Sequence, residues 1–202
     1  MPARDSVADD LLGQARAAVE RGDAVAATDL VARAFAADPS DPHVRDLYVG
    51  LHLARAIRLA ATAREARRAD IARRAIPYDT EFRDSPNVEA AFEEALRAHD
   101  DLLGADPGNE KVLVMKAALL FRRDREKGRA EALEILQRIQ EVHPENRQVA
   151  YAIKKVERPC PRCGDTGFCP YCAGRGTKTF VRVERRCERC HGQGICPVCG
   201  IL

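Results

Sequence analysis

Apolar residues recur at helical spacing through most of the first 157 residues of the chain. Between residues 8 and 41 they fall at intervals of three and four in two stretches, which Gly22-Asp23 separates and Asp38-Pro39 closes. This spacing places apolar side chains on one face of a helix, and glycine or proline interrupts it. The segment therefore predicts two antiparallel helices joined by a short turn.

The ending of this hairpin recurs twice further along the chain. Pro39 is followed by Pro107 after 68 residues and by Pro144 after a further 37, and each proline stands at the end of a predicted helix. A spacing of 68 is twice the period of about 34 residues that tetratricopeptide repeats show. The longer second spacing indicates a short insertion, which is expected between Arg125 and Gly128.

Residues 8–41 resemble a tetratricopeptide repeat, with Gly22 at the turn between the helices and Ala27 and Ala34 at the small contact positions. The resemblance implies an array of antiparallel helical hairpins that binds partners through its surface. Such an array needs a last helix to cover its exposed end. We expect hairpins at 8–41 and at about 110–146, and the closing helix at 145–157.

The middle of the chain departs from the repeat pattern. Residues 42–75 make one long helical stretch rich in Arg and Ala, and a loop is expected over residues 76–86, where a repeat would begin its next helix. We therefore treat the centre as an elaborated repeat. Two aromatic residues of the loop, Tyr78 and Phe82, are expected to pack against the neighbouring helices, although they would also suit the anchoring of a partner.

Charge is nearly balanced, with 33 basic and 31 acidic residues and a net charge of +2. This balance excludes a global field that would attract nucleic acid or a membrane surface, and no apolar run is long enough to span a bilayer. One local run of arginines has two interpretations: a stripe that binds phosphates, or a solvated helix face. The run consists of Arg55, Arg58, Arg64, Arg67, Arg68, Arg73 and Arg74.

All eight cysteines lie after residue 158, arranged as four C-x-x-C pairs. Two such turns supply the four sulfurs of a closed tetrahedral zinc site, which holds structure and leaves no position open for a substrate. The chain thus divides into a helical domain, 1–157, and a zinc finger with two Zn²⁺, 158–202, which is too small to fold without metal. With no export signal after Met1, reduced thiols and a cytoplasmic location are expected.

The four pairs are symmetric about the centre of the finger. The gaps between them are 5, 14 and 5 residues, as expected for a chain that runs out, turns and returns beside itself. The outer pairs share the pattern C-P-x-C-G and the inner pairs share C-x-x-C-x-G-x-G. Between the inner pairs, residues 177–185 alternate in the manner of a strand.

The inner motifs resemble the cysteine-rich domain of DnaJ-class co-chaperones. Asp165 departs from that family's pattern by occupying the first glycine position of the outer motif. The resemblance implies nested ligation, first pair with fourth and second with third, and the palindromic gaps support it independently. One zinc is then assigned to Cys160, Cys163, Cys196 and Cys199, and the other to Cys169, Cys172, Cys187 and Cys190.

Two of the cysteine pairs have other interpretations. Cys187-Glu-Arg-Cys190-His191 fits a c-type haem attachment site, but it is the one pair of four that carries a His, and no export signal is expected. Cys169-Pro-Tyr-Cys172 resembles a glutaredoxin active site, but glycine turns flank it where that chemistry needs a βαβ context. Iron in place of zinc in the outer C-P-x-C-G site stays open.

The sequence favours a non-enzymatic adaptor over an enzyme. His143-Pro144-Glu145 is similar to the His-Pro-Asp loop of J domains, but it has Glu in place of Asp and lacks the flanking segments of a J domain. No nucleophile, base or phosphate loop stands out elsewhere. We expect a helical groove and a structural finger that bind a protein or an unfolded polypeptide. The alternatives are a thiol oxidoreductase and a nucleic-acid-associated zinc protein, the latter using the arginine run and Arg175, Arg182, Arg185 and Arg186.

Overall fold

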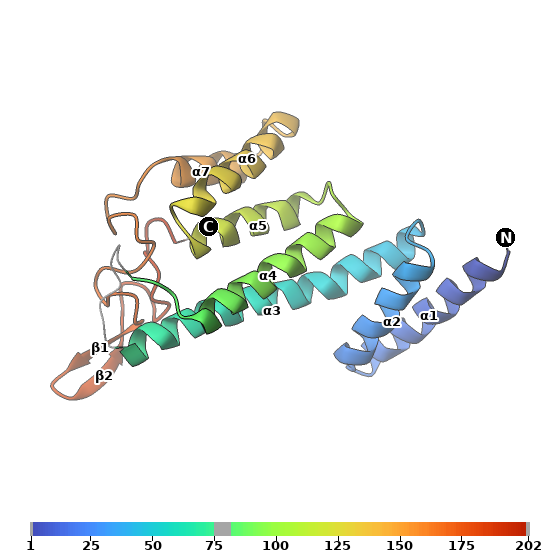
Figure 1. Ribbon diagram of the computed structural model, residues 1–202, viewed down its shortest axis with the longest axis horizontal. Coiled ribbons are helices and arrows are strands. Elements are labelled where there is room, and N and C mark those ends of the chain that lie inside the picture. Colours follow the sequence, from blue (N-terminus) through green and yellow to red (C-terminus); the bar gives the residue numbers. More distant parts are fainter. Residues whose placement is uncertain (1, 75–81, 201–202) are drawn as a thin grey trace.

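The computed structural model describes residues 2–74 and 82–200, with side chains from residue 7 onward. In this part the chain forms seven α-helices followed by one small antiparallel β-hairpin, so that it is mainly α, as expected (Figure 1). The helices are α1 Pro2–Glu20, α2 Ala24–Ala37, α3 Pro42–Arg74, α4 Pro86–Ala105, α5 Glu110–Arg123, α6 Lys127–Val142 and α7 Arg147–Glu157, and the strands are β1 Thr177–Phe180 and β2 Val183–Arg186.

Helices α1 and α2 form the hairpin that the apolar spacing predicts at 8–41. Gly22 takes a φ of +74° at the turn, a left-handed conformation that favours glycine. Asp23 then begins α2, since its carboxylate accepts a hydrogen bond from the amide of Ala26. Ala27 and Ala34 are fully buried, which lets the neighbouring helices approach closely.

The three prolines that mark the sequence period stand in three similar turns. Asp38, just before Pro39, closes α2 by donating its backbone N–H to the carbonyl of Ala34. Three residues later Asp41 accepts the amide of His43 on its side chain, at 2.7 Å, and α3 begins. The other two turns have the same arrangement. Asp106 closes α4 and the side chain of Asn109 caps α5. His143 closes α6 and the side chain of Asn146 caps α7.

Helix α3 connects the two ends of the molecule. Its 33 residues span about 50 Å at 1.5 Å per residue. Near its start, Val44 packs with Leu11, Leu12 and Ala34 in a small core shared with α1 and α2. Its second half lies beside α4, and its last turns reach the cysteine-rich segment (Figure 1).

The main hydrophobic core lies among α3 to α7. Phe92 on α4 and Phe121 on α5 are its largest side chains and are fully buried. Helices α5 and α6 cross closely at Gly128, where a Cβ atom would overlap the carbonyl oxygen of Leu120. Residues 125–128, where the sequence predicts an insertion, form the turn into α6 and its first two residues.

The loop before α4 is described from Phe82 onward, so Tyr78 lies outside the described residues. Phe82 is buried, with the guanidinium of Arg74 4.5 Å from its ring centre. Burial of Phe82 agrees with the packing role predicted for it. None of the described helices carries a stretch long and apolar enough to cross a membrane.

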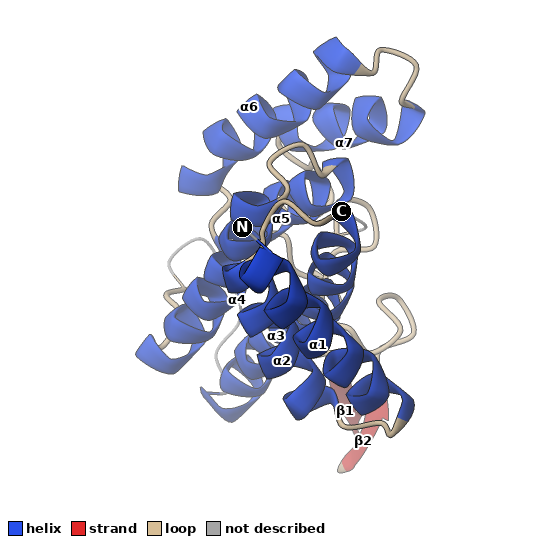
Figure 2. Ribbon diagram, turned by 90° about the vertical axis from the view of Figure 1, so that its right-hand side faces the viewer, coloured by secondary structure: helices blue, strands red, loops and turns tan. Residues whose placement is uncertain are grey.

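The strand-like alternation of residues 177–185 corresponds to two strands and not to one. Thr177 pairs with Arg186 and Phe180 with Val183, so the chain reverses within the segment. Val181 and Arg182 adopt positive φ angles of 46° and 65°, which suit a two-residue hairpin turn. The hairpin projects from the body, at the end away from α6 and α7 (Figure 2).

Candidate metal centre

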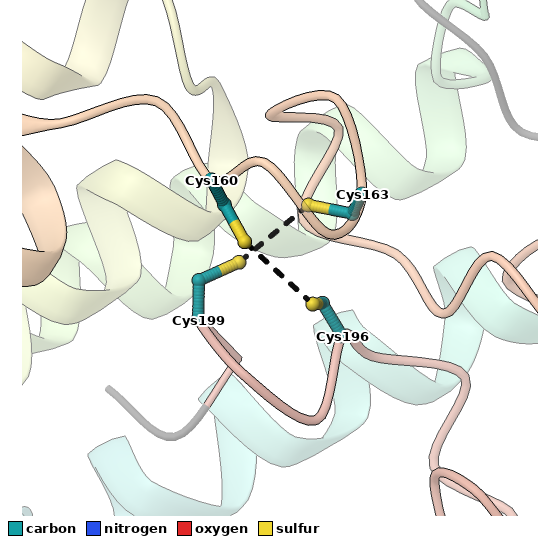
Figure 3. Close-up of side chains that lie close together, drawn as sticks. All are labelled: Cys160, Cys163, Cys196 and Cys199. Atoms are coloured by element: carbon teal, nitrogen blue, oxygen red, sulfur yellow. Dashed lines mark hydrogen bonds between the residues drawn. The ribbon is translucent and has the colours of Figure 1, made fainter.

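Four cysteines converge from the two ends of the finger. The sulfur atoms of Cys160, Cys163, Cys196 and Cys199 lie within 4.8 Å of one another, and all four residues are buried. Figure 3 shows the four side chains pointing toward a common centre. The Sγ atoms of Cys160 and Cys196 are 4.0 Å apart, and those of Cys163 and Cys199 are 3.6 Å apart. We call this group the outer site.

A second group of four forms at the base of the β-hairpin. Cys169, Cys172, Cys187 and Cys190 are buried, and their sulfurs also lie within 4.8 Å of one another. The Sγ atoms of Cys172 and Cys190 are 3.7 Å apart. We call this group the inner site.

Both groups have the dimensions of a tetrahedral metal site. Four sulfurs at about 2.3 Å from a zinc ion are separated by about 3.8 Å along each edge of the tetrahedron. The observed separations of 3.6–4.0 Å match this edge, and they are far longer than the roughly 2.05 Å of a disulfide bond. All eight thiols are free, and soft thiolate donors favour zinc or iron over hard cations.

The cysteines are grouped in the nested order. Phe168 and Ile195 form an antiparallel bridge between the two groups. On either side of it, the amide of Cys169 donates to the carbonyl of Gly194, and that of Cys196 to the carbonyl of Gly167, each at 2.9 Å. The returning chain thus lies beside the outgoing one, as the palindromic gaps indicate.

Three of the four C-x-x-C pairs continue into the same left-handed turn. The first, second and fourth residues after Cys163, after Cys172 and after Cys190 all have positive φ angles. The fourth residue is glycine each time, and its amide donates to the preceding cysteine sulfur at 3.3–3.4 Å. In the inner site the close approach also requires glycine, since a Cβ on Gly176 would overlap the carbonyl oxygen of Gly192.

Asp165 occupies a position where the inner motifs have Gly174 and Gly192. Its φ is +64°, a conformation that aspartate tolerates better than most residues. Its carboxylate accepts the amide of Cys160 at 3.2 Å and pairs with the guanidinium of Arg129 on α6. Asp165, in place of glycine, therefore connects the outer site to the helical domain.

Burial disfavours the thiolate form of several cysteines in the two groups. Burial raises the pKa of the Cys169 thiol to about 11, and burial also raises the pKa of Cys163, Cys172 and Cys199, with neighbouring cysteines adding to it. Four thiolates at such short separations repel one another strongly. A bound divalent ion would supply the compensating charge and fix the four sulfurs in place.

Two neighbouring arginines of α3 have different roles, one within the helical domain and one in attaching the finger to it. Arg67 on α3 is 3% exposed; it pairs with Asp84 and donates to the carbonyl of Arg122 at 2.7 Å. Its neighbour Arg68 donates to the carbonyl of Gly192 in the inner motif at 3.0 Å. The spacing of charges along the sequence gave no sign of these contacts, because each partner lies far away in the chain.

The arginine run on α3 is neither a continuous stripe nor a uniformly solvated face. Besides Arg67 and Arg68, Arg73 and Arg74 both pair with the buried Asp70. The remaining three, Arg55, Arg58 and Arg64, are exposed.

The structure places the features behind the rival interpretations either within the inner site or away from both sites. His191 follows Cys190 in a left-handed turn and belongs to neither group of possible metal ligands in the described part of the chain. The Cys169 pair is enclosed by the inner site and its glycine turns. His143-Pro144-Glu145 forms the turn between α6 and α7. Comparison with known protein families, curated proteins and solved structures finds no match for this chain.

Proposed function

We propose that this protein is a non-enzymatic adaptor that binds a protein partner or an unfolded polypeptide. A helical array of the tetratricopeptide type would present one surface, and a DnaJ-type finger with two Zn²⁺ would present another. The protein holds its client and performs no chemistry on it.

The order of the helices supports the array. Pairs α1–α2, α3–α4 and α5–α6 are each followed by one of the three proline turns, and α7 comes last. In this scheme α3 and α4 are an elongated central repeat, and α7 covers the end of the main core through Val149, Ala152 and Val156. Solenoids built in this way bind along an extended surface.

The finger contributes the observation that carries the proposal. At the tip of the β-hairpin, Phe180, Val181 and Val183 are 70%, 78% and 55% exposed. Adjacent apolar side chains displayed on a projecting element are costly in water and are typical of surfaces that contact another polypeptide. The two metal sites would fix the base of the hairpin, so that its tip is held in a defined orientation.

Suppression of aggregation tests this assignment. The zinc-loaded protein should reduce light scattering from a chemically denatured client, with weak dependence on salt because apolar contacts dominate. Phe180→Ser should weaken the effect several-fold. Val25→Ser is the matched control, since Val25 on α2 is 83% exposed and lies away from the finger. Equal losses in both variants, or no suppression by the parent protein, would refute the proposal.

A nucleic-acid role is the second candidate, and a cluster on the finger favours it. Three cations surround the ring of Tyr171: Arg162, Lys178 and Arg189 lie 5.1, 5.5 and 5.2 Å from its centre. Aromatic rings flanked by cations can stack bases and contact phosphates. The two tetrathiolate sites would offset much of this charge, since each zinc with four thiolates carries −2.

A shift assay with single-stranded RNA at two salt concentrations separates the candidates. Tight binding that falls steeply with salt and is lost in Tyr171→Ser, without any effect on a denatured client, would replace the adaptor by this alternative.

A further inference from the structure

A cavity lies where the finger meets α3, α4 and α5. Its volume is about 290 Å³, and its walls include Phe92 from the helical domain and Phe168 and Ile195 from the finger. Gly167 and Gly174 bring backbone close to it without side chains. A space of this size with apolar walls suits a small molecule.

Five arginines line this cavity, and their charge is only partly balanced. Glu65 is the one acid among the described lining residues, and it pairs with Arg68 at 2.8 Å. Asp84 neutralises Arg67 from outside. The charges that remain belong to Arg64 and Arg122, and in part to Arg125. Nη1 of Arg125 lies 3.9 Å from a carboxylate oxygen of Asp165, and that carboxylate also pairs with Arg129.

Each of these three arginines has hydrogen-bond donors without a partner among the described residues. Nε of Arg122 and both Nε and Nη1 of Arg125 are buried without a hydrogen-bond partner in the described part of the chain. Arg64 on α3 has no acid or acceptor partner there either, and it stands exposed at the rim. Buried donors that lack a partner are costly, and in native proteins they usually have an unseen acceptor.

The three charges also act on one another. Burial and the positive charges of Arg64 and Arg125 lower the pKa of Arg122 to about 10. Mutual repulsion of this kind is unfavourable in the empty cavity, and an anion placed among the three guanidinium groups would relieve it.

We propose that this cavity binds a small molecule through an oxyanion group, either phosphate or carboxylate, which Arg64, Arg122 and Arg125 hold. Guanidinium groups recognise both groups by charge-assisted, bidentate hydrogen bonds. Phe92, Phe168 and Ile195 would contact the uncharged part of the ligand. This site is independent of the polypeptide-binding role proposed above.

A second cavity on the other side of Arg122 and Arg125 fits an anion less well. It is larger, about 730 Å³, but its walls carry several acids, among them Asp84, Glu89 and Asp124. Of these two cavities, the smaller one therefore has the larger excess of positive charge.

A competing role for the arginines is to offset the charge of the outer site. Arg125 is close enough to Cys199 to lower the pKa of that thiol against the effect of its burial, and Arg122 donates to the carbonyl of Gly200 at 3.3 Å. Arg64 has no such contact with the finger, so its substitution distinguishes the two roles.

Calorimetric titration of the full zinc-loaded chain tests the site, with inorganic phosphate, glycerol phosphate and succinate as probes. At least one probe should bind saturably with a 1:1 stoichiometry, and the comparison among the three identifies the recognised group and its source. Arg64→Gln should weaken that binding by at least about tenfold. Arg58→Gln, also exposed on α3 but outside the cavity, should leave it unchanged.

Zinc content and helical signal should be the same in both variants, because neither arginine forms a hydrogen bond or ion pair with the described residues of the finger. A second variant, Arg125→Lys, should keep the charge but lose the bidentate geometry, and so weaken binding as well. Absence of saturable binding by all three probes, or equal weakening by Arg64→Gln and Arg58→Gln, would overturn the proposal.

Discussion

The carboxylate of Asp165 pairs with the guanidinium of Arg129, and this pair joins the outer metal site to α6. Asp165 also caps the amide of Cys160, while Arg129 donates to the carbonyl of Val156 at the end of α7. One ion pair thus links the first metal-binding turn to the last two helices. The finger is therefore in contact with a helix that lies apart from its first metal-binding turn in the sequence.

Coupling between Asp165 and Arg129 should be measurable. A double-mutant cycle with Asp165→Asn and Arg129→Gln in urea unfolding of the zinc-loaded protein should give about 1–2 kcal/mol, because the pair is largely shielded from water. The exposed pair Glu134 and Arg138 on the same helix is the control and should give below about 0.5 kcal/mol. Equal coupling energies for the two pairs would show that Asp165 does not fasten the finger.

Nested pairing predicts a specific loss of metal. The parent protein should contain two zinc ions, and Cys160→Ser should retain one, held by the inner site. Amide shifts at Gly176 and Gly194, which donate to inner-site sulfurs, should then persist while that of Gly167 changes. Metal analysis with NMR checks this. Disturbance of Gly176 with Gly194 unaffected would instead indicate sequential pairing.

The last glycine of the first inner motif, Gly176, should be irreplaceable. Gly176→Ala would place a Cβ against the carbonyl oxygen of Gly192 and force alanine into a φ of +79°, so we expect loss of inner-site zinc. Gly104→Ala in α4 is the matched control, because a Cβ there meets open space and alanine favours the helix by about 1 kcal/mol. Zinc analysis and thermal unfolding of both variants provide the test, and full zinc retention by Gly176→Ala would contradict it.

The metal ligands and most of the helices can be predicted from the sequence, because the motifs that specify them are local. The C-x-x-C turns, the glycines after them and the proline-marked helix ends each act within a few residues. Palindromic spacing added one long-range relationship, the nested grouping of cysteines.

Contacts that depend on folding were beyond the sequence. Arg67 looks like any other arginine of a basic helix, yet it is buried because Asp84 and the end of α5 supply its acceptors. In the sequence, Asp165 is a departure from a glycine motif with no evident partner. In the structure, it forms an ion pair with Arg129. Residues 177–185 alternate throughout, and only the positive φ angles of Val181 and Arg182 reveal the reversal.

Substitution of Arg67 should reveal its structural role. Arg67→Ala leaves Asp84 and two backbone carbonyls without their partner, and we expect a loss of about 3–5 kcal/mol in stability. Arg58→Ala on the same helix should change stability by less than about 0.5 kcal/mol, because Arg58 is exposed. Denaturant titration of both variants is the measurement. Similar losses of stability in the two variants would show that Arg67 behaves like a solvent-exposed arginine and has no structural role.

Zinc binding should release protons and weaken as pH falls. Because the pKa of Cys169 is raised to about 11 and the pKa of Cys172 is also raised, these thiols are protonated at neutral pH in the absence of metal. Each must lose its proton to coordinate, so acidification displaces the ion. Calorimetry in buffers of different ionisation enthalpy should detect the released protons. Zinc uptake without proton release would contradict the raised pKa values.

Nested grouping also sets an order of assembly. Closing the inner site restricts the 14 residues between Cys172 and Cys187, whereas closing the outer site across Cys163 and Cys196 restricts 32. The smaller loop costs about 0.7 kcal/mol less entropy to close. Once it is closed, the two outer pairs are brought together by the bridge at Phe168 and Ile195. Metal uptake should therefore proceed from the hairpin outward, with the ion of the outer site bound last.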